Sequence, residues 1–266
     1  MTSSSYEVLK LEREGHVAVI TLNRPEKLNA LNPALASEFH AALDEVAAEN
    51  GIRVLILTGS GRGFCSGADV NRQLASLEGR QEGVASLPGL GIAELAPHIR
   101  RIPQPVIAAV NGVAAGAGLA ITLASDIRIA SEEARFSCIF IKRAIVPDTG
   151  ASYTLAKQVG NGIAMEMALT GNIYEAKWAL EKGLVNRVVP AERLMEEAMS
   201  LAGDIVVNAP IAVRSVKQVI YSLVDTDLQE ILPRESAANA PSVGTEDRAE
   251  AVRSFLEKRS PVFKGM

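Results

Sequence analysis

Two stretches of small residues, each following an apolar run, could bring the backbone close to a ligand. The first lies in VLILTGSGRGFCSGAD, residues 54–69, and the second in VIAAVNGVAAGAG, residues 106–118. Small residues allow close approach of the backbone, and two N–H groups from separate loops can converge on one carbonyl oxygen and stabilise an enolate or oxyanion. Taken alone, each stretch is more simply explained by tight turns and strand–helix packing.

Asp148, in IVPDTGASYTL, is the candidate for moving a proton beside that oxygen. A carboxylate can act as a general acid–base, and the apolar neighbours Phe140, Ile141 and Val146 would desolvate it as this task requires. The alternative is a helix cap, because Asp148 lies just before a predicted helix and aspartate is favoured at such positions. The pattern alone leaves both open.

Other motifs for catalysis or cofactor binding are incomplete. The run from Gly59 to Gly63 follows a strand but lacks the GxGxxG spacing and a clear following helix, so a dinucleotide site is rejected. Cys65-Ser66-Gly67 is not the GxSxG elbow of serine hydrolases. Two cysteines and three histidines, with no CxxC pair and no histidine pair at ligand spacing, predict no metal site.

The composition is that of a globular protein, with 266 residues of which 48% are apolar and 22% charged. The net charge of −4 argues against nucleic-acid binding, although a local basic patch would be enough for a phosphorylated ligand. The N-terminus lacks the apolar core of a signal sequence, and no apolar run approaches membrane-spanning length. We therefore expect a cytoplasmic protein that binds neither nucleic acid nor membranes.

Alternating strands and helices are expected to position these candidates, which favours an α/β core. Apolar runs predict strands at residues 8–12, 17–22, 54–58, 106–110, 127–130 and 185–189. Helical spacing and capping residues predict helices at residues 33–50, 92–102, 116–124, 150–159, 162–170, 175–181, 194–208, 211–223, 228–239 and 246–258. Residues 70–90 are polar and glycine-rich, with little periodicity. The change to helices alone near residue 200 predicts a core over residues 1–200 and a helical region over residues 201–266.

Four motifs together resemble the crotonase, or enoyl-CoA hydratase/isomerase, superfamily over essentially the full length. They are TLNRPEKLNAL at 21–31, RGFCSGAD at 62–69, VNGVAAGAG at 110–118 and FLEKRSPVF at 255–263. The resemblance implies a spiral of ββα units with a C-terminal helical trimerisation region, assembled as a homotrimer or a dimer of trimers. It also implies an acyl-CoA substrate, no cofactor beyond the CoA of that substrate, and the N–H groups of Ala68 and Ala117 as donors to the thioester carbonyl.

The resemblance extends to positions that bind CoA. Arg24 and Lys27 lie in the loop similar to the family's CoA-binding loop, and charged phosphates require such cations. Lys258 falls where the family has a lysine near the adenine, often supplied by a neighbouring subunit. An exposed, solubilising charge is the alternative for each lysine and arginine, and Asp69 is adequately explained as a structural cap. The other positions expected at the substrate are Ala30, Gly67, Asp69, Gly116 and Phe140.

The chain departs from the family at the catalytic acids. Hydratases carry two glutamates, whose positions hold Ala120 and Phe140 here. Adding water across a double bond needs an acid–base pair, so ordinary hydratase chemistry is not expected. An aspartate at the place of Asp148 resembles the phenylacetate-pathway isomerases, which act on a ring-epoxide CoA ester and shift enoyl-CoA double bonds. It also resembles 4-chlorobenzoyl-CoA dehalogenase, in which this aspartate is the nucleophile.

The chemistry favours the isomerase. A dehalogenase must hydrolyse an aryl ester and needs a base to activate water; its histidine aligns with Ala93 and its tryptophan with Phe140, while His98 lies elsewhere on the same predicted helix. An isomerase needs one carboxylate, which we expect to be Asp148. A hydratase with an atypical acid, a dehalogenase-like hydrolase and a non-catalytic acyl-CoA-binding protein stay open. So do a role for Glu94, for which a solvated helix face is the commoner explanation, and the identity of the acyl group, whose pocket we expect residues 70–90 to line.

Overall fold

The computed structural model describes residues 6–69, 91–222, 237, 240–242 and 245–266. The expectation that residues 70–90 line the acyl pocket lies outside the described residues. Apart from residue 237, so does the helix predicted over residues 228–239.

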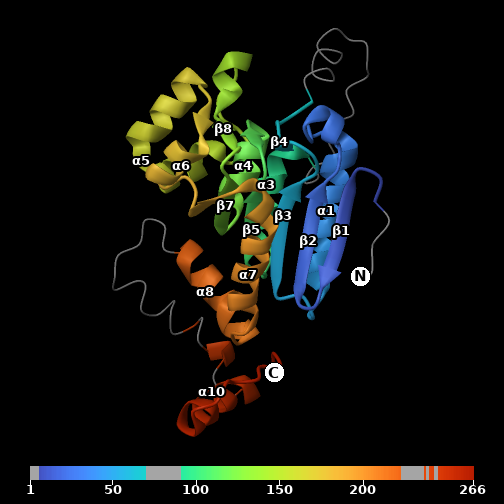
Figure 1. The fold of residues 1–266 in the computed structure, drawn as a ribbon, viewed down its shortest axis with the longest axis vertical. Coiled ribbons are helices and arrows are strands. Elements are labelled where there is room, and N and C mark those ends of the chain that lie inside the picture. The colour runs from blue at the N-terminus through green and yellow to red at the C-terminus, as the bar shows by residue number, and fades with distance from the viewer. Residues whose placement is uncertain (1–5, 70–90, 223–236, 238–239, 243–244) are drawn as a thin grey trace.

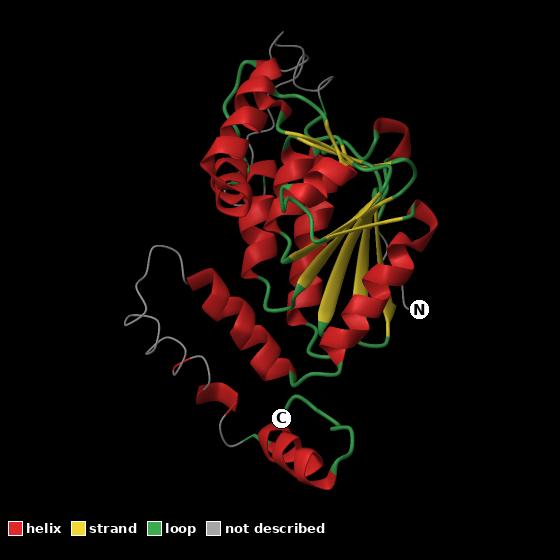
Figure 2. Cartoon of the chain, turned by 60° about the vertical axis from the view of Figure 1, so that its left-hand side comes forward, coloured by secondary structure: helices red, strands yellow, loops and turns green. Residues whose placement is uncertain are grey.

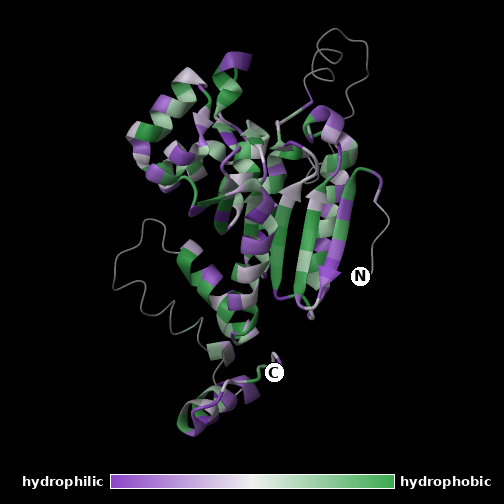
Figure 3. Ribbon diagram, in the orientation of Figure 1, coloured by the Kyte–Doolittle hydropathy of each residue, from purple (hydrophilic) through white to green (hydrophobic). Residues whose placement is uncertain are grey.

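The larger of two sheets contains all six predicted strands. Its order is β1-β2-β3-β5-β7-β10, and β1 and β2 form an antiparallel hairpin while the other neighbours are parallel. The inner strands β3 and β5 are buried along their whole length, as in a sheet covered on both faces, and β3 is visibly hydrophobic in Figure 3. The strands are β1 (Leu9–Glu14), β2 (Val17–Leu22), β3 (Val54–Gly59), β5 (Val106–Val110), β7 (Ile127–Ser131) and β10 (Arg187–Val189).

A second sheet of four short strands follows the ends of the first. Its order is β4-β6-β8-β9, with β4 (Gly63–Cys65), β6 (Val113–Ala115), β8 (Arg135–Ser137) and β9 (Tyr174–Glu175). Within a few residues, β3 leads to β4, β5 to β6 and β7 to β8, so successive units place one strand in each sheet. This arrangement confirms the α/β spiral of ββα units. None of these four strands was expected from the sequence, because two or three residues are too few to show a strand periodicity.

Helices pack around the two sheets (Figures 1 and 2). The first begins as predicted: Pro33 occupies its first turn, and Asn32 Oδ1 accepts a hydrogen bond from the Leu35 N–H at 2.8 Å. The α-helices are α1 (Pro33–Ala48), α3 (Leu95–Arg101), α4 (Ala117–Ala124), α5 (Ala151–Thr170), α6 (Ala176–Glu181), α7 (Leu194–Val206), α8 (Pro210–Ser222) and α10 (Glu246–Glu257). Short 3-10 helices are η1 (Pro25–Lys27), η2 (Ile92–Glu94), η3 (Ile139–Arg143), η4 (Ala191–Arg193) and η5 (Ala240–Ser242).

Three element boundaries differ from the prediction. Residues 92–102 are divided into η2 and α3 rather than forming one helix. The two helices expected at 150–159 and 162–170 form the single element α5, which is interrupted at Gly160 by a non-helical backbone with φ +77°. The last strand begins at Arg187 rather than at residue 185, and Val185 is instead buried in the core.

Helix α7 packs against the larger sheet and shares a buried cluster with it. Its residues Leu194, Ala198 and Ala202 form one buried cluster with residues of β2, β3, β5 and β7. The boundary expected after residue 200 therefore falls inside a helix that packs on the sheet. Beyond it, α8 turns back toward β7, where its Lys217 and Tyr221 contact Asp126, whereas α10 lies away from the two sheets (Figure 1).

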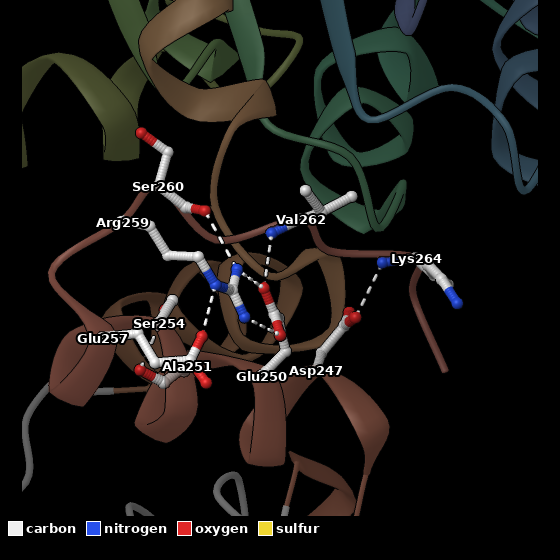
Figure 4. Close-up of polar contacts among 9 residues, drawn as sticks. All are labelled: Asp247, Glu250, Ala251, Ser254, Glu257, Arg259, Ser260, Val262 and Lys264. Carbon is white, nitrogen blue, oxygen red and sulfur yellow. Dashed lines mark hydrogen bonds and ion pairs between the residues drawn. The ribbon is translucent and has the colours of Figure 1, made fainter.

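The C-terminal segment is held by its own polar contacts (Figure 4). The carboxylate of Asp247 accepts the N–H groups of Lys264 and Gly265 at 2.7 and 2.8 Å. Arg259 pairs with the carboxylates of Glu250 and Glu257. These contacts fold the last residues back along α10.

One arginine of the core reaches this segment. The guanidinium of Arg53 donates to the carbonyl of Val206 at the end of α7 (3.0 Å) and to the carbonyl of Phe263 (2.9 Å). Arg53 directly precedes β3, so the C-terminal segment is tied to the base of the central sheet.

Among the described residues, no helix taken singly has the length and apolar character to cross a membrane. Residues 191–206 and 210–222 meet that test only as a pair bent by 106°, and only by length and composition.

Candidate active site

A cavity of about 200 Å³ lies where β4, α4 and η3 meet. Six of the residues predicted from the sequence line it together, although they come from distant parts of the chain. These six are Gly67, Ala68, Gly116, Ala117, Phe140 and Asp148. The other lining residues are Ser66, Ile92, Ala93, Ile139, Arg143, Ile145 and Thr149.

The first candidate donor is set by a parallel bridge between Leu31 and Ala68. The Leu31 N–H donates to Gly67 O at 2.8 Å, and the Asp69 N–H donates to Leu31 O at 2.9 Å. A parallel bridge of this kind uses the peptide groups on either side of the bridged residue. The N–H of Ala68 therefore points away from Leu31, on the side where Ala68 lines the cavity.

The second candidate donor is the N–H of Ala117, the first residue of α4. An N–H in the first turn has no acceptor within its own helix, and it lies at the positive end of the helix dipole. Gly116 precedes it with φ +55°. A Cβ placed on Gly67 would lie 3.4 Å from the Ala117 nitrogen, so the two glycine turns are in contact.

Gly118 explains why the two turns stay together. A Cβ at this position would lie 2.0 Å from the carbonyl oxygen of Cys65, far closer than any non-bonded contact allows. The close approach of α4 to β4 therefore requires glycine here. The two turns form a rigid pair in which backbone groups, rather than side chains, face the cavity.

Asp148 lines the same cavity, and its side chain does not cap a helix. The N-cap of α5 is Gly150, in the left-handed conformation, and the helix has no side-chain cap. The Asp148 carboxylate instead accepts a hydrogen bond from Thr149 Oγ1 at 2.8 Å, and only its backbone carbonyl bonds the N–H of Ala151. The cap explanation is wrong, and the carboxylate is exposed on the cavity side.

The expected apolar surroundings of Asp148 are only partly present. Phe140 is 4% exposed and lines the cavity. Ile141 and Val146 are 44% and 76% exposed and do not line it, so the expectation that they desolvate the carboxylate is wrong for the single chain.

No second acid faces the cavity in the described part of the chain. The two positions that hold glutamate in the family's hydratases are Ala120, fully buried in α4, and Phe140. Glu94 ends η2 and is not among the lining residues, whereas Ala93 is. Asp148 is thus the one carboxylate on the wall among the described residues.

His98 does not substitute for a histidine at position 93. Its Nδ1 is 2.8 Å from Nδ1 of His40, and its Nε2 is 3.0 Å from the carboxylate of Asp44. Both contacts are to α1. The ring is committed to α1, and His98 is not among the residues that line the cavity.

Arg24, Ala30 and Asp69 support the loop that carries Ala68. Arg24 forms an ion pair with Asp69 at 3.2 Å and donates to the carbonyl of Ala30 at 2.5 Å. The Arg24 side chain is 14% exposed. Its guanidinium is therefore engaged within the protein, and CoA binding by these three residues stays a prediction.

Lys27 and Lys258 are both exposed but lie far apart. Lys27 ends η1, and its carbonyl accepts a hydrogen bond from Ser66 Oγ at 3.3 Å, beside the cavity. Lys258 directly follows α10, which lies at the other end of the molecule from β4 and α4 (Figure 1). Their predicted contacts with CoA are not tested by a single chain.

Sequence reasoning missed Arg143. It lines the cavity together with Phe140 and Asp148. A signal was available, since Arg143 lies only five residues before Asp148 in the same loop. It places a positive charge on the wall that carries the carboxylate.

The cysteines are not nucleophiles. Burial raises the pKa of Cys65 to about 12, against a smaller opposing effect of the Gly67 N–H, and raises the pKa of Cys138 to about 11. Thiolates are the reactive form, so both thiols are inert near neutral pH. No group of three or more His, Cys, Asp or Glu residues in the described ranges could hold a metal ion.

A larger cavity of about 660 Å³ lies between α8 and the end of the sheet at β7, and the acid in its wall, Asp126, is already paired. Asp126 accepts hydrogen bonds from the Val106 N–H (2.7 Å) and the Tyr221 hydroxyl (2.5 Å), and pairs with Lys217 at 3.0 Å. Burial lowers the pKa of Lys217 and raises the pKa of Tyr221. This cluster stabilises the fold, and the smaller cavity is the one whose groups face a ligand.

Comparisons with known proteins identify the family. A family model described as enoyl-CoA hydratase/isomerase matches residues 12–266. A short-chain-enoyl-CoA hydratase from Clostridium acetobutylicum is 39% identical over 252 residues, 94% of each chain. A 1,2-epoxyphenylacetyl-CoA isomerase from Escherichia coli is 37% identical over 258 residues, 95% of this chain and 96% of that protein. The crystal structure of an enoyl-CoA hydratase from Bacillus anthracis has a TM-score of 0.90 at 35% identity, covering 98% of this chain and 100% of that one.

Proposed function

The chain belongs to the enoyl-CoA hydratase/isomerase family, and we propose that within it the chain is a cofactor-independent isomerase of a CoA thioester. The observation that carries this proposal is the single carboxylate, Asp148, on the described wall of the cavity. Both hydratase and isomerase names occur among relatives of nearly equal identity, so the choice rests on the site.

The first step is recognition of the thioester. Its carbonyl oxygen lies between the N–H groups of Ala68 and Ala117, which the glycine turns bring to one cavity. Fixed donors of this kind stabilise negative charge as it develops, with no reorganisation during the reaction. They favour the enolate over the neutral thioester.

The second step is a proton transfer within the substrate. The Asp148 carboxylate takes a proton from one carbon of the acyl group, which gives the enolate and a carboxylic acid. The acid then returns the proton to another carbon as the double bond shifts. The atoms balance without water, so one carboxylate is sufficient.

A substrate panel tests this proposal. The purified protein is incubated with a 3-enoyl-CoA, with crotonyl-CoA and with a 4-halobenzoyl-CoA. We expect conversion of the 3-enoyl-CoA to the conjugated 2-enoyl-CoA. Hydration of crotonyl-CoA without isomerisation would instead assign a hydratase, and halide release a dehalogenase. Tight binding of acyl-CoA with no turnover would assign a binding protein.

We also propose that the working form is a homotrimer or a dimer of trimers in the cytoplasm. The position of α10 supports an assembly, because Lys258 lies away from the cavity of its own chain (Figure 1). Light scattering of the purified chain measures the subunit number, and a monomer that turns over acyl-CoA would contradict the proposal.

A further inference from the structure

A histidine pair lies behind the cavity and has no part in the proton transfer described above. His40 of α1 and His98 of α3 are stacked, with ring centroids 5.1 Å apart and ring planes at 21°. His40 is 1% exposed. Its Nδ1 contacts Nδ1 of His98 at 2.8 Å, and its Nε2 lies 3.1 Å from the carbonyl oxygen of Gly91.

The contacts of the pair determine where its hydrogens lie. A carbonyl only accepts, so Nε2 of His40 carries a hydrogen and donates it to Gly91 O. The Nδ1–Nδ1 contact has room for one hydrogen: two would collide, and none would leave two lone pairs facing each other. When His40 is neutral, that hydrogen belongs to Nδ1 of His98.

The outer nitrogen of His98, Nε2, lies 3.0 Å from the carboxylate of Asp44, whose side chain is 71% exposed. Burial, the largest effect, lowers the pKa of His98, Asp44 opposes this effect, and His40 and Arg101 add to the lowering. Water can therefore replace the contact with Asp44, whereas the ring of His40 is buried.

Gly91 is where the wall of the cavity begins. It is the N-cap of η2, and its carbonyl also accepts the N–H of Glu94 at 3.2 Å. Ile92 and Ala93, the next two residues, line the cavity. A buried ring on α1 thus contacts the peptide that leads into Ile92 and Ala93.

We propose that His40 is a positioning residue for the acyl group, which holds Gly91 and thereby fixes the wall formed by Ile92 and Ala93. His98 and Asp44 hold the ring of His40 in the tautomer that donates to Gly91. The inference rests on the proposed function, because that function makes this cavity the acyl site. A long acyl group fills more of the cavity than a short one, so its binding depends more on the placement of this wall.

Two substitutions of His40 test the proposal. The amide nitrogen of His40→Gln can reach the place of Nε2 and donate to Gly91, whereas His40→Asn places its amide near Nδ1 and loses that bond. The Kd for saturated four-carbon and eight-carbon acyl-CoA thioesters and the kcat and KM of the matching enoyl thioesters are measured. For His40→Asn we expect the affinity to fall about tenfold more for the eight-carbon thioester than for the four-carbon thioester. The change should appear in Kd and KM, with kcat little altered. His40→Gln should remain within about twofold of the wild type.

His16 supplies the matched control, because its Nδ1 contacts the carbonyl of Gly51 at 2.8 Å, away from the cavity. His16→Gln removes a similar contact, and its affinity for both thioesters should fall by the same small factor. Equal losses with both chain lengths in His40→Asn, or no loss, would overturn the proposal. A ¹⁵N spectrum that shows Nε2 of His40 without a hydrogen would overturn it as well.

The binding measurements separate this inference from the proposed function. If the wild type turns over no member of the panel, the isomerase assignment fails, but the ratio of the two Kd values still decides whether His40 positions the acyl wall. If the wild type isomerises its substrate but the ratio of the two Kd values is the same in His40→Asn, the isomerase assignment is supported and the proposed role of His40 is rejected.

Discussion

The two walls of the cavity are built in opposite ways. The wall of Gly67–Ala68 and Gly116–Gly118 presents backbone groups, and Gly67 and Gly118 lie too close to neighbouring backbone oxygens to admit a Cβ. The wall of residues 139–149 presents side chains from a loop in which residues 141–146 are exposed. This loop includes two non-glycine residues with positive φ, Ala144 (+56°) and Thr149 (+53°).

The difference shows how the two kinds of catalytic group depend on sequence. A backbone donor requires only that no side chain obstruct it, so the sequence marks it by glycine. A general base requires one particular side chain, and the loop around it is free to vary in packing. Substitutions in the first wall should therefore affect folding and function together, whereas substitutions in the second should separate them.

Asp148→Asn should have the largest effect on activity. Loss of a general acid–base group lowers kcat by about 10²–10⁴-fold, while an exposed side chain contributes little to stability, within about 0.5 kcal/mol. Isomerisation of a 3-enoyl-CoA and the urea unfolding midpoint are measured on the same preparation. The control is Glu133→Gln, an exposed carboxylate that does not line the cavity. Full activity of Asp148→Asn would show that this wall holds no base.

Gly118→Ala should be the most damaging change in the backbone wall. The added methyl meets the Cys65 carbonyl at 2.0 Å, and we expect a loss of about 3 kcal/mol or more in the free energy of unfolding. Gly116→Ala is the matched control, because its Cβ would come no closer than 3.6 Å to Ile139 and its cost is backbone strain alone, about 1–3 kcal/mol at φ +55° and ψ −123°. Urea denaturation ranks the two, and a milder effect of Gly118→Ala would contradict the close contact between the turns.

The buried thiols give the backbone wall a pH dependence. The pKa of Cys65 is raised to about 12, and an unfolded thiol titrates near 8.5. Above about pH 8.5 the unfolded state loses the proton first, so stability falls by about 1.4 kcal/mol per pH unit until the pH approaches the raised value. The urea midpoint at about pH 7.5 and about pH 9.5 should shift less in Cys65→Ala than in the wild type. An unchanged shift would mean that the thiol is solvated in the native protein.

Ala144→Gly should have the smallest effect, and its sign is stabilising. Ala144 adopts φ +56°, which costs a residue with a Cβ about 1–2 kcal/mol, and the gain from glycine is partly offset by its freedom in the unfolded chain. We expect a net gain of about 0.5–1 kcal/mol in thermal or urea unfolding. Lys142→Gly, in the same loop but without a positive φ, should instead destabilise. If both variants were less stable than the wild type, removal of the positive-φ strain at residue 144 would not stabilise the loop.

Local signals predicted much of the fold. Asn32 and Pro33 marked the start of α1, and the apolar runs of β3 and β5 marked the buried strands, because each signal lies within a few adjacent residues. The strands β4, β6, β8 and β9 left no such signal. They are defined by pairing with each other rather than by their own side chains.

The same limit applies to the site. The glycine turns and Asp148 could be selected from the sequence because they lie in continuous motifs, and they do meet at one cavity. The pairing of Arg24 with Asp69 could not be read from the sequence, since the partners are 45 residues apart. Nor could the contact between His40 and His98, which are 58 residues apart.

The hydrogen bonds of Arg53 constrain the amino acid at position 53 more than the amino acids whose carbonyls it contacts. Arg53 donates to the backbone carbonyls of Val206 and Phe263, and every residue type offers a carbonyl. The side chains at positions 206 and 263 can therefore be substituted without loss of these two hydrogen bonds. At position 53 a single substitution can remove both hydrogen bonds. The C-terminal segment can therefore vary in sequence only as long as Arg53, directly before β3, is kept.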